Sequence, residues 1–225
     1  MSENTQINGL NTQASVIFDE ITKLGIIRRF TLVGGTALAL QLNHRKSEDF
    51  DFMLWRTHKG EQMSVEWDKI VHAFESVGKI ENINVFGFDH VTFNIRNVKF
   101  SFYASQRRSP LNRRIHIQEN LFIADIESIA VMKMELLTRR NAFRDYYDIY
   151  CIFKAIDDSS KIKSLFEATL KHAEHRVSSK SLFSFLGNAE RIEEDKNFQL
   201  LEPKYLVTTK EIETYLKEQI RITKQ

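Results

Sequence analysis

The stretch that decides the fold reads Val33-Gly34-Gly35-Thr36-Ala37-Leu38-Ala39-Leu40, and it is preceded by the apolar residues 30–32. Residues 30–33 predict a short buried strand, and residues 36–42 predict a short helix. The two glycines between them allow a turn in which no Cβ stands in the way. Backbone N–H groups at the start of a helix attract anions, so the turn predicts a phosphate cradle formed by Gly34, Gly35 and Thr36.

A pair of acidic residues follows shortly after this turn, in the run Asp49-Phe50-Asp51-Phe52. Side chains of a strand alternate between its faces, so Asp49 and Asp51 project to one side and the two phenylalanines to the other. Neighbouring carboxylates repel each other unless a positive charge lies between them, and a divalent metal supplies that charge well. We therefore predict a site for Mg²⁺ or Mn²⁺ at Asp49 and Asp51. Taken alone, the pair is equally consistent with a solvated strand edge, and the glycines with an ordinary tight turn.

Composition is that of an ordinary globular protein of 225 residues, with 42% hydrophobic and 28% charged residues. A net charge of +2 does not by itself indicate binding to nucleic acid. Cys151 is the single cysteine, so no internal disulfide can form, which fits a reducing cytoplasm. We find no apolar stretch long enough to cross a bilayer and no signal peptide, and we therefore predict a cytoplasmic protein without a membrane partner.

Hydrophobic periodicity divides the chain into a mixed first part and a helical second part. Strands are predicted at residues 30–33, at the segment that carries Asp49 and Asp51, and at 80–86, 91–95, 98–103 and 121–124. Helices are predicted at 10–27, 36–42, 61–77, 142–155, 162–172, 180–189 and 210–223, and a further one follows Asp125. The fold class is thus α+β: a mixed sheet with flanking helices over residues 1–124, then a helical bundle over residues 125–225.

A second block of residues agrees with the first: Asp125, Met132-Lys133, Arg140 and Arg144-Asp145-Tyr146-Tyr147-Asp148. Together the two blocks resemble the signature of the AbiEii/AbiGii toxin family. Its members are nucleotidyltransferase-like proteins of bacterial abortive-infection and toxin–antitoxin systems, and they resemble the DNA polymerase β-type nucleotidyltransferase superfamily. Two separated blocks in the right order are a far more specific match than either block alone.

The resemblance implies a magnesium-dependent transfer of a nucleotidyl group from a nucleoside triphosphate to an RNA or protein acceptor, and a cognate antitoxin as partner. It assigns catalysis to Asp49, Asp51 and Lys133. It also assigns nucleotide binding to Gly34, Gly35, Thr36, Lys133, Arg140, Arg144, Asp145 and Asp148. Asp145 and Asp148 lie three positions apart in a predicted helix and so share a face, where they either orient the cations or contact the nucleotide.

One departure from the family pattern concerns the third carboxylate that the superfamily usually draws from a later strand. Ser101 stands at that position, in the run Val98-Lys99-Phe100-Ser101-Phe102-Tyr103. A serine neither binds a metal well nor accepts a proton well at neutral pH. The alternative function is therefore a nucleotide-binding module without transfer activity. Replacement bases remain open among Glu48, Asp89, Asp145 and Asp148.

A basic, proline-containing stretch over residues 107–114 has two interpretations. Its arginines are typical of a solvated loop, and next to a nucleotidyltransferase site they could also hold the phosphates of an RNA acceptor.

Overall fold

The computed structural model describes residues 6–109, 113–172 and 177–224. Contacts divide the chain into two compact units, Met1–Asp125 and Ile126–Gln225, and each is described by itself. The first unit holds a mixed sheet with helices on it, and the second is entirely helical in its described residues. The predicted fold class is confirmed.

Seven described strands form one sheet in the order β3-β4-β5-β2-β1-β7-β6. Their bounds are β1 Thr31–Val33, β2 Phe50–Arg56, β3 Ile80–Phe86, β4 His90–Ile95, β5 Val98–Arg108, β6 Arg114–Gln118 and β7 Leu121–Ala124. The central strand β2 runs antiparallel to β1 and parallel to β5. This pairing matters for function, because it places Ser101 of β5 directly beside Asp51 of β2.

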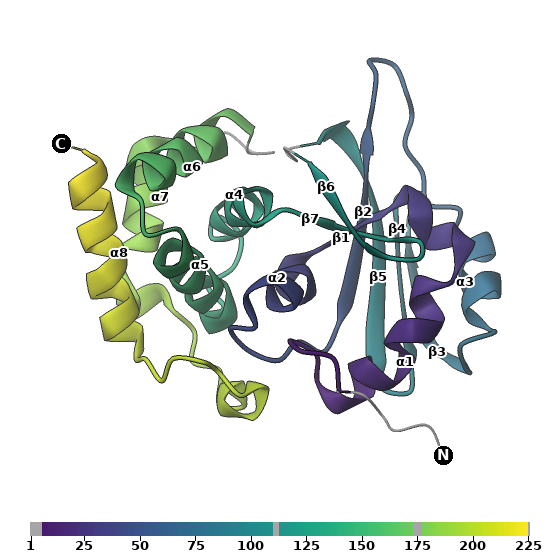
Figure 1. Ribbon diagram of the computed structural model, residues 1–225. Coiled ribbons are helices and arrows are strands. Elements are labelled where there is room, and N and C mark those ends of the chain that lie inside the picture. The colour runs from purple at the N-terminus through teal and green to yellow at the C-terminus, as the bar shows by residue number, and fades with distance from the viewer. Residues whose placement is uncertain (1–5, 110–112, 173–176, 225) are drawn as a thin grey trace. The chain divides into compact units, whose positions relative to one another are not determined.

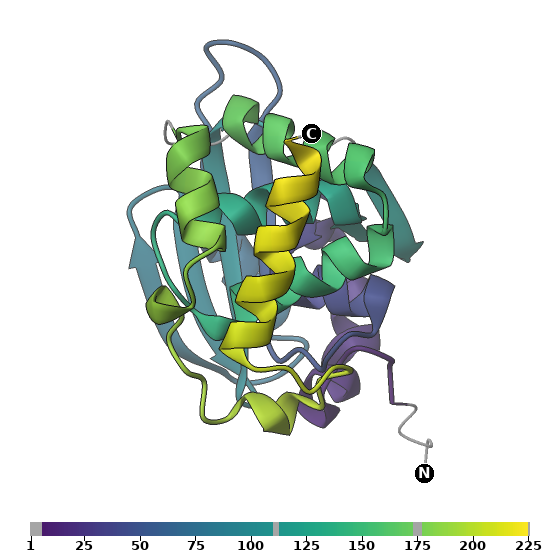
Figure 2. The same ribbon diagram turned by 90° about the vertical axis from the view of Figure 1, so that its left-hand side faces the viewer.

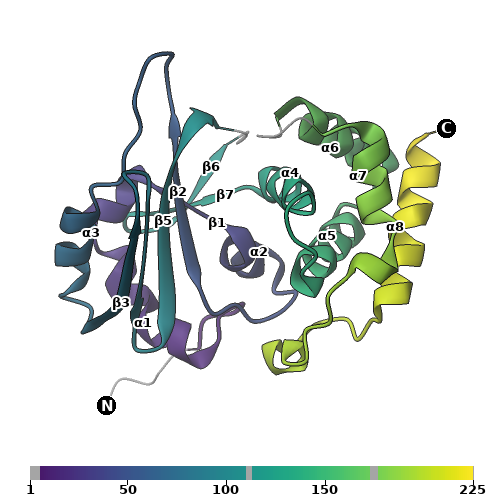
Figure 3. The ribbon, with the colours of Figure 1, turned by 180° about the vertical axis from the view of Figure 1, so that it is seen from behind.

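Helices cover the two faces of the sheet unequally. Helices α1 (Thr12–Thr22) and α3 (Trp67–Phe74) lie over one face, and the short helix α2 (Gly34–Leu42) lies over the other (Figure 1). The view from behind shows the same arrangement (Figure 3). A 3-10 turn at Gly25–Arg29 connects α1 to β1.

Phenylalanines fill the layer under α1 and α3. The ring of Phe50 stacks on that of Phe100 with centroids 5.3 Å apart, and Phe52 stacks on Phe102 at 4.8 Å. Phe74 of α3 meets Phe100 edge-on at 5.0 Å. Burying these rings is the main reason for the register of β2 on β5, since a slip by one residue would turn the phenylalanines out of the core. The alternation of the strand then leaves the odd-numbered residues of β2 on the opposite face.

In the second unit, helix α8 packs against α5, α6 and α7, and Figure 2 shows it in yellow in front of the other helices of this unit. The helices are α4 Ile126–Leu136, α5 Phe143–Ile156, α6 Ser159–His172, α7 Ser179–Leu186 and α8 Thr209–Thr223, with 3-10 turns at Ala189–Arg191 and Phe198–Leu201. Helix α5 is buried along most of its length, and Tyr146, Tyr147 and Phe153 are its largest fully buried side chains. The single cysteine, Cys151, is also buried on this helix.

Some element boundaries differ from the predicted ones. The helix predicted over residues 10–27 ends at Thr22, and a 3-10 turn takes its place from Gly25. The helix predicted over 61–77 is shorter, at Trp67–Phe74. Strand β6 was not predicted: Ile115 and Ile117 alternate with polar residues, but the alternation spans only five residues of an edge strand whose side chains are largely exposed.

The basic stretch proves to be partly structural. The guanidinium of Arg114 donates hydrogen bonds to the carbonyls of Arg28 and Phe30 and lies 4.4 Å from the centroid of the Phe122 ring. Arg114 therefore holds the edge of the sheet together rather than standing free in a loop. Residues 110–112 of this stretch lie outside the described residues.

Candidate functional site

The glycine turn and the second aspartate of the acidic pair lie against each other. Strand pairing places Asp51 opposite Val33, the last residue before the turn. Gly34 follows with φ +71°, a left-handed conformation that favours glycine, and a Cβ there would stand 3.0 Å from Oδ2 of Asp51. The Asp51 carboxylate therefore sits directly beside the turn, on the same face of the sheet. Asp51 is half-buried, and Asp49, just before the strand, is exposed.

Helix α2 begins at this turn without a side-chain cap. Its N-cap residue, Val33, makes no capping hydrogen bond through its side chain. The first N–H groups of a helix need partners from outside the helix, and a phosphate supplies them well. Gly34, Gly35 and Thr36 thus occupy the position that an anion cradle requires, and their binding to a nucleotide stays a prediction.

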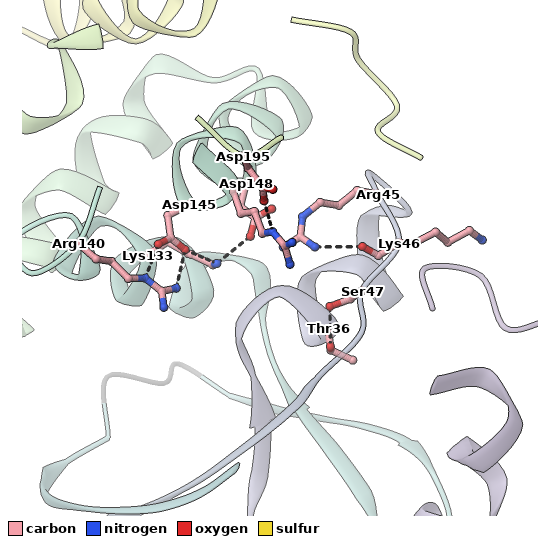
Figure 4. Close-up of polar contacts among 10 residues, drawn as sticks. Thr36, Arg45, Lys46, Ser47, Lys133, Arg140, Asp145, Asp148 and Asp195 are labelled. Carbon is pink, nitrogen blue, oxygen red and sulfur yellow. Dashed lines mark hydrogen bonds and ion pairs between the residues drawn. The ribbon is translucent and has the colours of Figure 1, made fainter. Parts of the chain in front are cut away.

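An arginine that the sequence did not single out lies across Gly35. A Cβ at Gly35 would be 2.5 Å from Nη2 of Arg45, so a larger residue there would displace the guanidinium from its present position. Arg45 is buried, and its Nη1 donates to the carbonyl of Lys46 at 3.0 Å (Figure 4). Its signal in the sequence was its place in the basic loop between the glycine turn and the acidic pair, within the stretch that resembles the family signature. Arg45 adds a positive charge at the turn where phosphate binding is predicted.

Thr36 uses its hydroxyl inside the protein. The hydroxyl donates to the main-chain carbonyl of Asp49 and lies 2.7 Å from the hydroxyl of Ser47 (Figure 4). These bonds tie the segment that leads into β2 to the first turn of α2. The hydroxyl therefore positions Asp49, and the phosphate contact predicted for Thr36 falls to its main-chain N–H.

The donor set suits a metal that is shared with a substrate. Among the described residues there is no group of three or more His, Cys, Asp or Glu side chains that would bind a metal without help. Mg²⁺ is commonly held by one or two carboxylates, with phosphate oxygens and water completing its octahedral shell. Asp49 and Asp51 beside an anion cradle fit that kind of site.

Ser101 lies directly beside Asp51. It is the Cα partner of Asp51 across the parallel β2–β5 pair, and of Thr92 across the antiparallel β4–β5 pair. Paired residues of adjacent strands share a face, so the Ser101 hydroxyl is on the same side as the Asp51 carboxylate. The serine thus stands where a third carboxylate would complete the site. Nε2 of His90 lies 3.3 Å from Oγ of Ser101, a neighbour that the sequence did not suggest.

In the second unit, the residues of the second sequence block form a buried ionic cluster (Figure 4). Nζ of Lys133 lies 2.6 Å from Oδ1 of Asp145 and 2.8 Å from Oδ2 of Asp148. Arg140 binds both oxygens of Asp145, through Nε at 2.6 Å and Nη2 at 2.9 Å. We call Lys133, Arg140, Asp145 and Asp148 the Lys133 cluster.

Charge balance explains how Asp145 stays ionised although it is buried. Burial disfavours the charged form of Asp145, but the positive charges of Lys133 and Arg140 and their hydrogen bonds outweigh it and lower the pKa of Asp145. Lys133 is held on both sides by carboxylates, an arrangement that fits the orienting role among the two alternatives for Asp145 and Asp148. Contact of these aspartates with a nucleotide stays a prediction. Arg140, with 54% of its side chain exposed, is the member of the cluster most open to solvent.

Arg144 binds an aspartate that is not part of the Lys133 cluster. Its Nε donates to Oδ2 of Asp195 at 2.6 Å. Asp145 is fully buried and turns inward to Lys133 and Arg140, so it takes no part in a surface ion pair. A role of Arg144 in nucleotide binding stays a prediction.

A family model matches most of the chain. The family model described as "Nucleotidyl transferase AbiEii toxin, Type IV TA system" matches residues 17–218. An uncharacterized protein of Aquifex aeolicus (strain VF5) is 26% identical over 208 residues, which cover 90% of this chain and 92% of that protein.

Two solved structures share the fold at low identity. MenT4, a nucleotidyltransferase toxin from Mycobacterium tuberculosis H37Rv, matches with a TM-score of 0.59 and 14% identity, over 95% of this chain and 85% of the other. JHP933 from Helicobacter pylori matches with a TM-score of 0.51 and 17% identity, over 95% and 93%. At these identities the likeness supports the fold. Within the described ranges, no helix has the length and apolar character needed to span a bilayer.

Proposed function

This chain belongs to the AbiEii family of nucleotidyl transferase toxins, and from this premise we propose that it is an Mg²⁺-dependent enzyme acting on a nucleoside triphosphate. It would transfer a nucleotidyl group to a hydroxyl of an RNA or protein acceptor. The observation that carries the proposal is the contact of the Asp51 carboxylate with the Gly34 turn at the uncapped start of α2. A cradle for phosphate and a ligand for a divalent cation are adjacent there, as phosphoryl transfer requires.

In this proposal the first unit binds the polyphosphate. The N–H groups of Gly34, Gly35 and Thr36 bind phosphate oxygens, and Arg45 adds a positive charge beside them. Asp49 and Asp51 hold the Mg²⁺ or Mn²⁺, which when bound neutralises phosphate charge and makes the α-phosphorus more open to attack. The hydrogen bonds of Thr36 keep the segment that carries Asp49 in place against α2.

For the second unit we propose the roles that the family signature assigns. Lys133 is the catalytic cation, and Asp145 and Asp148 fix its position. Arg140 binds nucleotide phosphate, since its exposed side chain can contact a ligand while Lys133 stays in its buried pairs. Arg144 and the two aspartates remain predicted nucleotide-binding residues. A cognate antitoxin and a cytoplasmic site of action are further parts of the proposal, and they rest on family membership alone.

The test is transfer of label from each of the four α-³²P-labelled nucleoside triphosphates to cell extract, with and without Mg²⁺. We expect labelled macromolecules with the natural chain, and sensitivity to ribonuclease or protease identifies the acceptor. Asp51→Asn should reduce labelling by roughly 10²–10³-fold, the usual cost of losing one electrostatic stabiliser of a transition state. Asp68→Asn, which changes an exposed carboxylate on α3, is the matched control and should label normally.

Two outcomes would count against transfer. Equal labelling by the natural chain and by Asp51→Asn would show that the activity is a contaminant. Mg²⁺-dependent nucleotide binding in calorimetry with no labelling at all would favour the alternative, a nucleotide-binding module, for which Ser101 beside Asp51 is the structural argument.

A further inference from the structure

The catalytic chemistry proposed above does not assign a residue that removes the proton of the acceptor hydroxyl. An acceptor hydroxyl that attacks phosphorus must lose its proton, and the residue nearest the expected position of the base is Ser101. A serine hydroxyl accepts a proton poorly at neutral pH unless it passes its own proton on. A base in hydrogen-bond contact with Ser101 would remove this difficulty.

His90 meets that requirement. It is the first residue of β4, and its Nε2 lies 3.3 Å from Oγ of Ser101. Strand pairing sets His90 opposite Tyr103 and Thr92 opposite Ser101, and because residues two apart in a strand share a face, all four project to the side of Asp51. The imidazole is thus on the catalytic face and one hydrogen bond away from the serine.

Aromatic neighbours fix the orientation of the imidazole. Phe86 of β3 stacks on it at 5.0 Å with an interplanar angle of 26°, and Tyr103 of β5 meets it edge-on at 5.9 Å and 90°. Because the imidazole of His90 is already packed against these two rings, little conformational entropy is lost when it is oriented to accept a proton from Ser101. This packing keeps Nε2 directed at Ser101.

We propose that His90 is the proton acceptor of the transfer reaction and that Ser101 relays the proton to it. This inference rests on the proposed function. As the acceptor oxygen bonds to the α-phosphorus, its proton moves to Oγ of Ser101, and the proton of Ser101 moves to Nε2 of His90. The bond from the α-phosphorus to the bridging oxygen breaks, and pyrophosphate leaves with the electron pair. His90 then releases the proton to solvent.

Burial favours the neutral form of His90. Desolvation lowers its pKa and outweighs the nearby charges, of which Asp89 and Asp51 raise the pKa and Lys99 lowers it. Tyr103, a further titratable group, is in contact with the ring. A neutral imidazole at neutral pH has one nitrogen able to accept a proton, which the relay requires of Nε2.

His90→Gln tests the relay with little change in shape, because glutamine can still bond to Ser101 but cannot act as a base. We expect transfer to fall by roughly 10²–10⁴-fold, the usual contribution of general-base catalysis, while nucleotide affinity in calorimetry stays as in the natural chain. His116→Gln, at an exposed position on the edge strand β6, is the control and should keep full activity.

The double variant His90→Gln/Ser101→Asp makes the test sharper. The carboxylate introduced by Ser101→Asp would accept the proton directly, so transfer should recover to within about 10-fold of the natural rate. The pH below which the transfer rate falls should move from the histidine range toward about pH 4. A variant with a merely disturbed structure would not regain activity through a second substitution. Natural rates for His90→Gln, or no recovery in the double variant, would overturn the proposal.

Nitrogen NMR of labelled histidine gives a readout that does not depend on turnover. We expect His90 to be neutral at pH 7, with the proton on Nδ1 and with Nε2 accepting the Ser101 hydroxyl. A proton on Nε2 at that pH would refute the relay even in an inactive protein. If the NMR spectra show Nε2 unprotonated but the labelling assay detects no nucleotidyl transfer, the proposed function is refuted, whereas the hydrogen bond between His90 and Ser101 is confirmed.

Discussion

Gly34 affects both the backbone conformation of the turn and the position of the Asp51 carboxylate. Its φ of +71° strains any L side chain, and an added Cβ would touch the Asp51 carboxylate. Gly60 has a similar φ of +92°, but a Cβ there would have no atom within 4 Å. Substituting each glycine by alanine therefore distinguishes two effects: both substitutions strain the backbone, but only the one at Gly34 also displaces Asp51.

We expect Gly34→Ala and Gly60→Ala to destabilise the protein similarly, by about 1–2 kcal/mol each, since both force alanine into the left-handed region. Only Gly34→Ala should also weaken nucleotide transfer, because its methyl group displaces a metal ligand of the proposed site. Urea denaturation and the labelling assay measure the two effects. Transfer by Gly34→Ala at the rate of Gly60→Ala would mean that the Asp51 position does not matter.

Helices α4 and α5 are joined by the Lys133 cluster. Lys133 comes from α4, Asp145 and Asp148 come from α5, and Arg140 lies in the connection between them. Removing one partner of a buried ion pair leaves the other charge poorly compensated, whereas an exposed pair contributes little. The cluster should therefore stabilise the packing of α4 on α5 more than the partly exposed Arg144–Asp195 pair stabilises the contact of α5 with the segment around Asp195.

Asp145→Asn should lower the free energy of unfolding by about 3 kcal/mol at pH 7, and Asp195→Asn by less than about 1 kcal/mol. The pKa of Asp145 is depressed in the folded state, so its contribution is complete above the unfolded pKa of about 4 and is lost as pH falls through the folded value. Urea denaturation between pH 3 and pH 7 should show a smaller loss of stability toward acid in Asp145→Asn. Parallel pH curves for the variant and the natural chain would contradict this account.

The behaviour of the whole molecule should report binding at the site. A ligand that binds only the folded chain stabilises it by about 2.7 kcal/mol at a concentration of 100 Kd. For a chain of this size, that corresponds to a rise in Tm of roughly 5–10 °C. We expect this rise with a nucleoside triphosphate plus Mg²⁺, and not with either alone.

Thermal unfolding followed by circular dichroism provides the measurement, with Asp49→Asn/Asp51→Asn as the variant that should show no rise. An equal rise in that variant, or a full rise in the presence of a chelator, would place the bound nucleotide somewhere other than at the acidic pair.

The sequence by itself determined the local features of this protein. Alternation of acidic and phenylalanine residues put Asp51 on the face opposite the buried rings, and the structure has that arrangement. The strand, glycine turn and short helix were equally readable, because each depends on neighbours in the chain. Family membership also followed from two motifs in order, and the family match confirms it.

Only the tertiary structure decided which strands became neighbours. A strand pattern specifies the face of each side chain but not the strand beside it, since pairing partners come from anywhere in the chain. Residues as distant as Asp51, His90 and Ser101 came together through the parallel β2–β5 pair and the antiparallel β4–β5 pair. The inward turn of Asp145 was likewise hidden, because burial and ion pairing depend on how α4 and α5 pack.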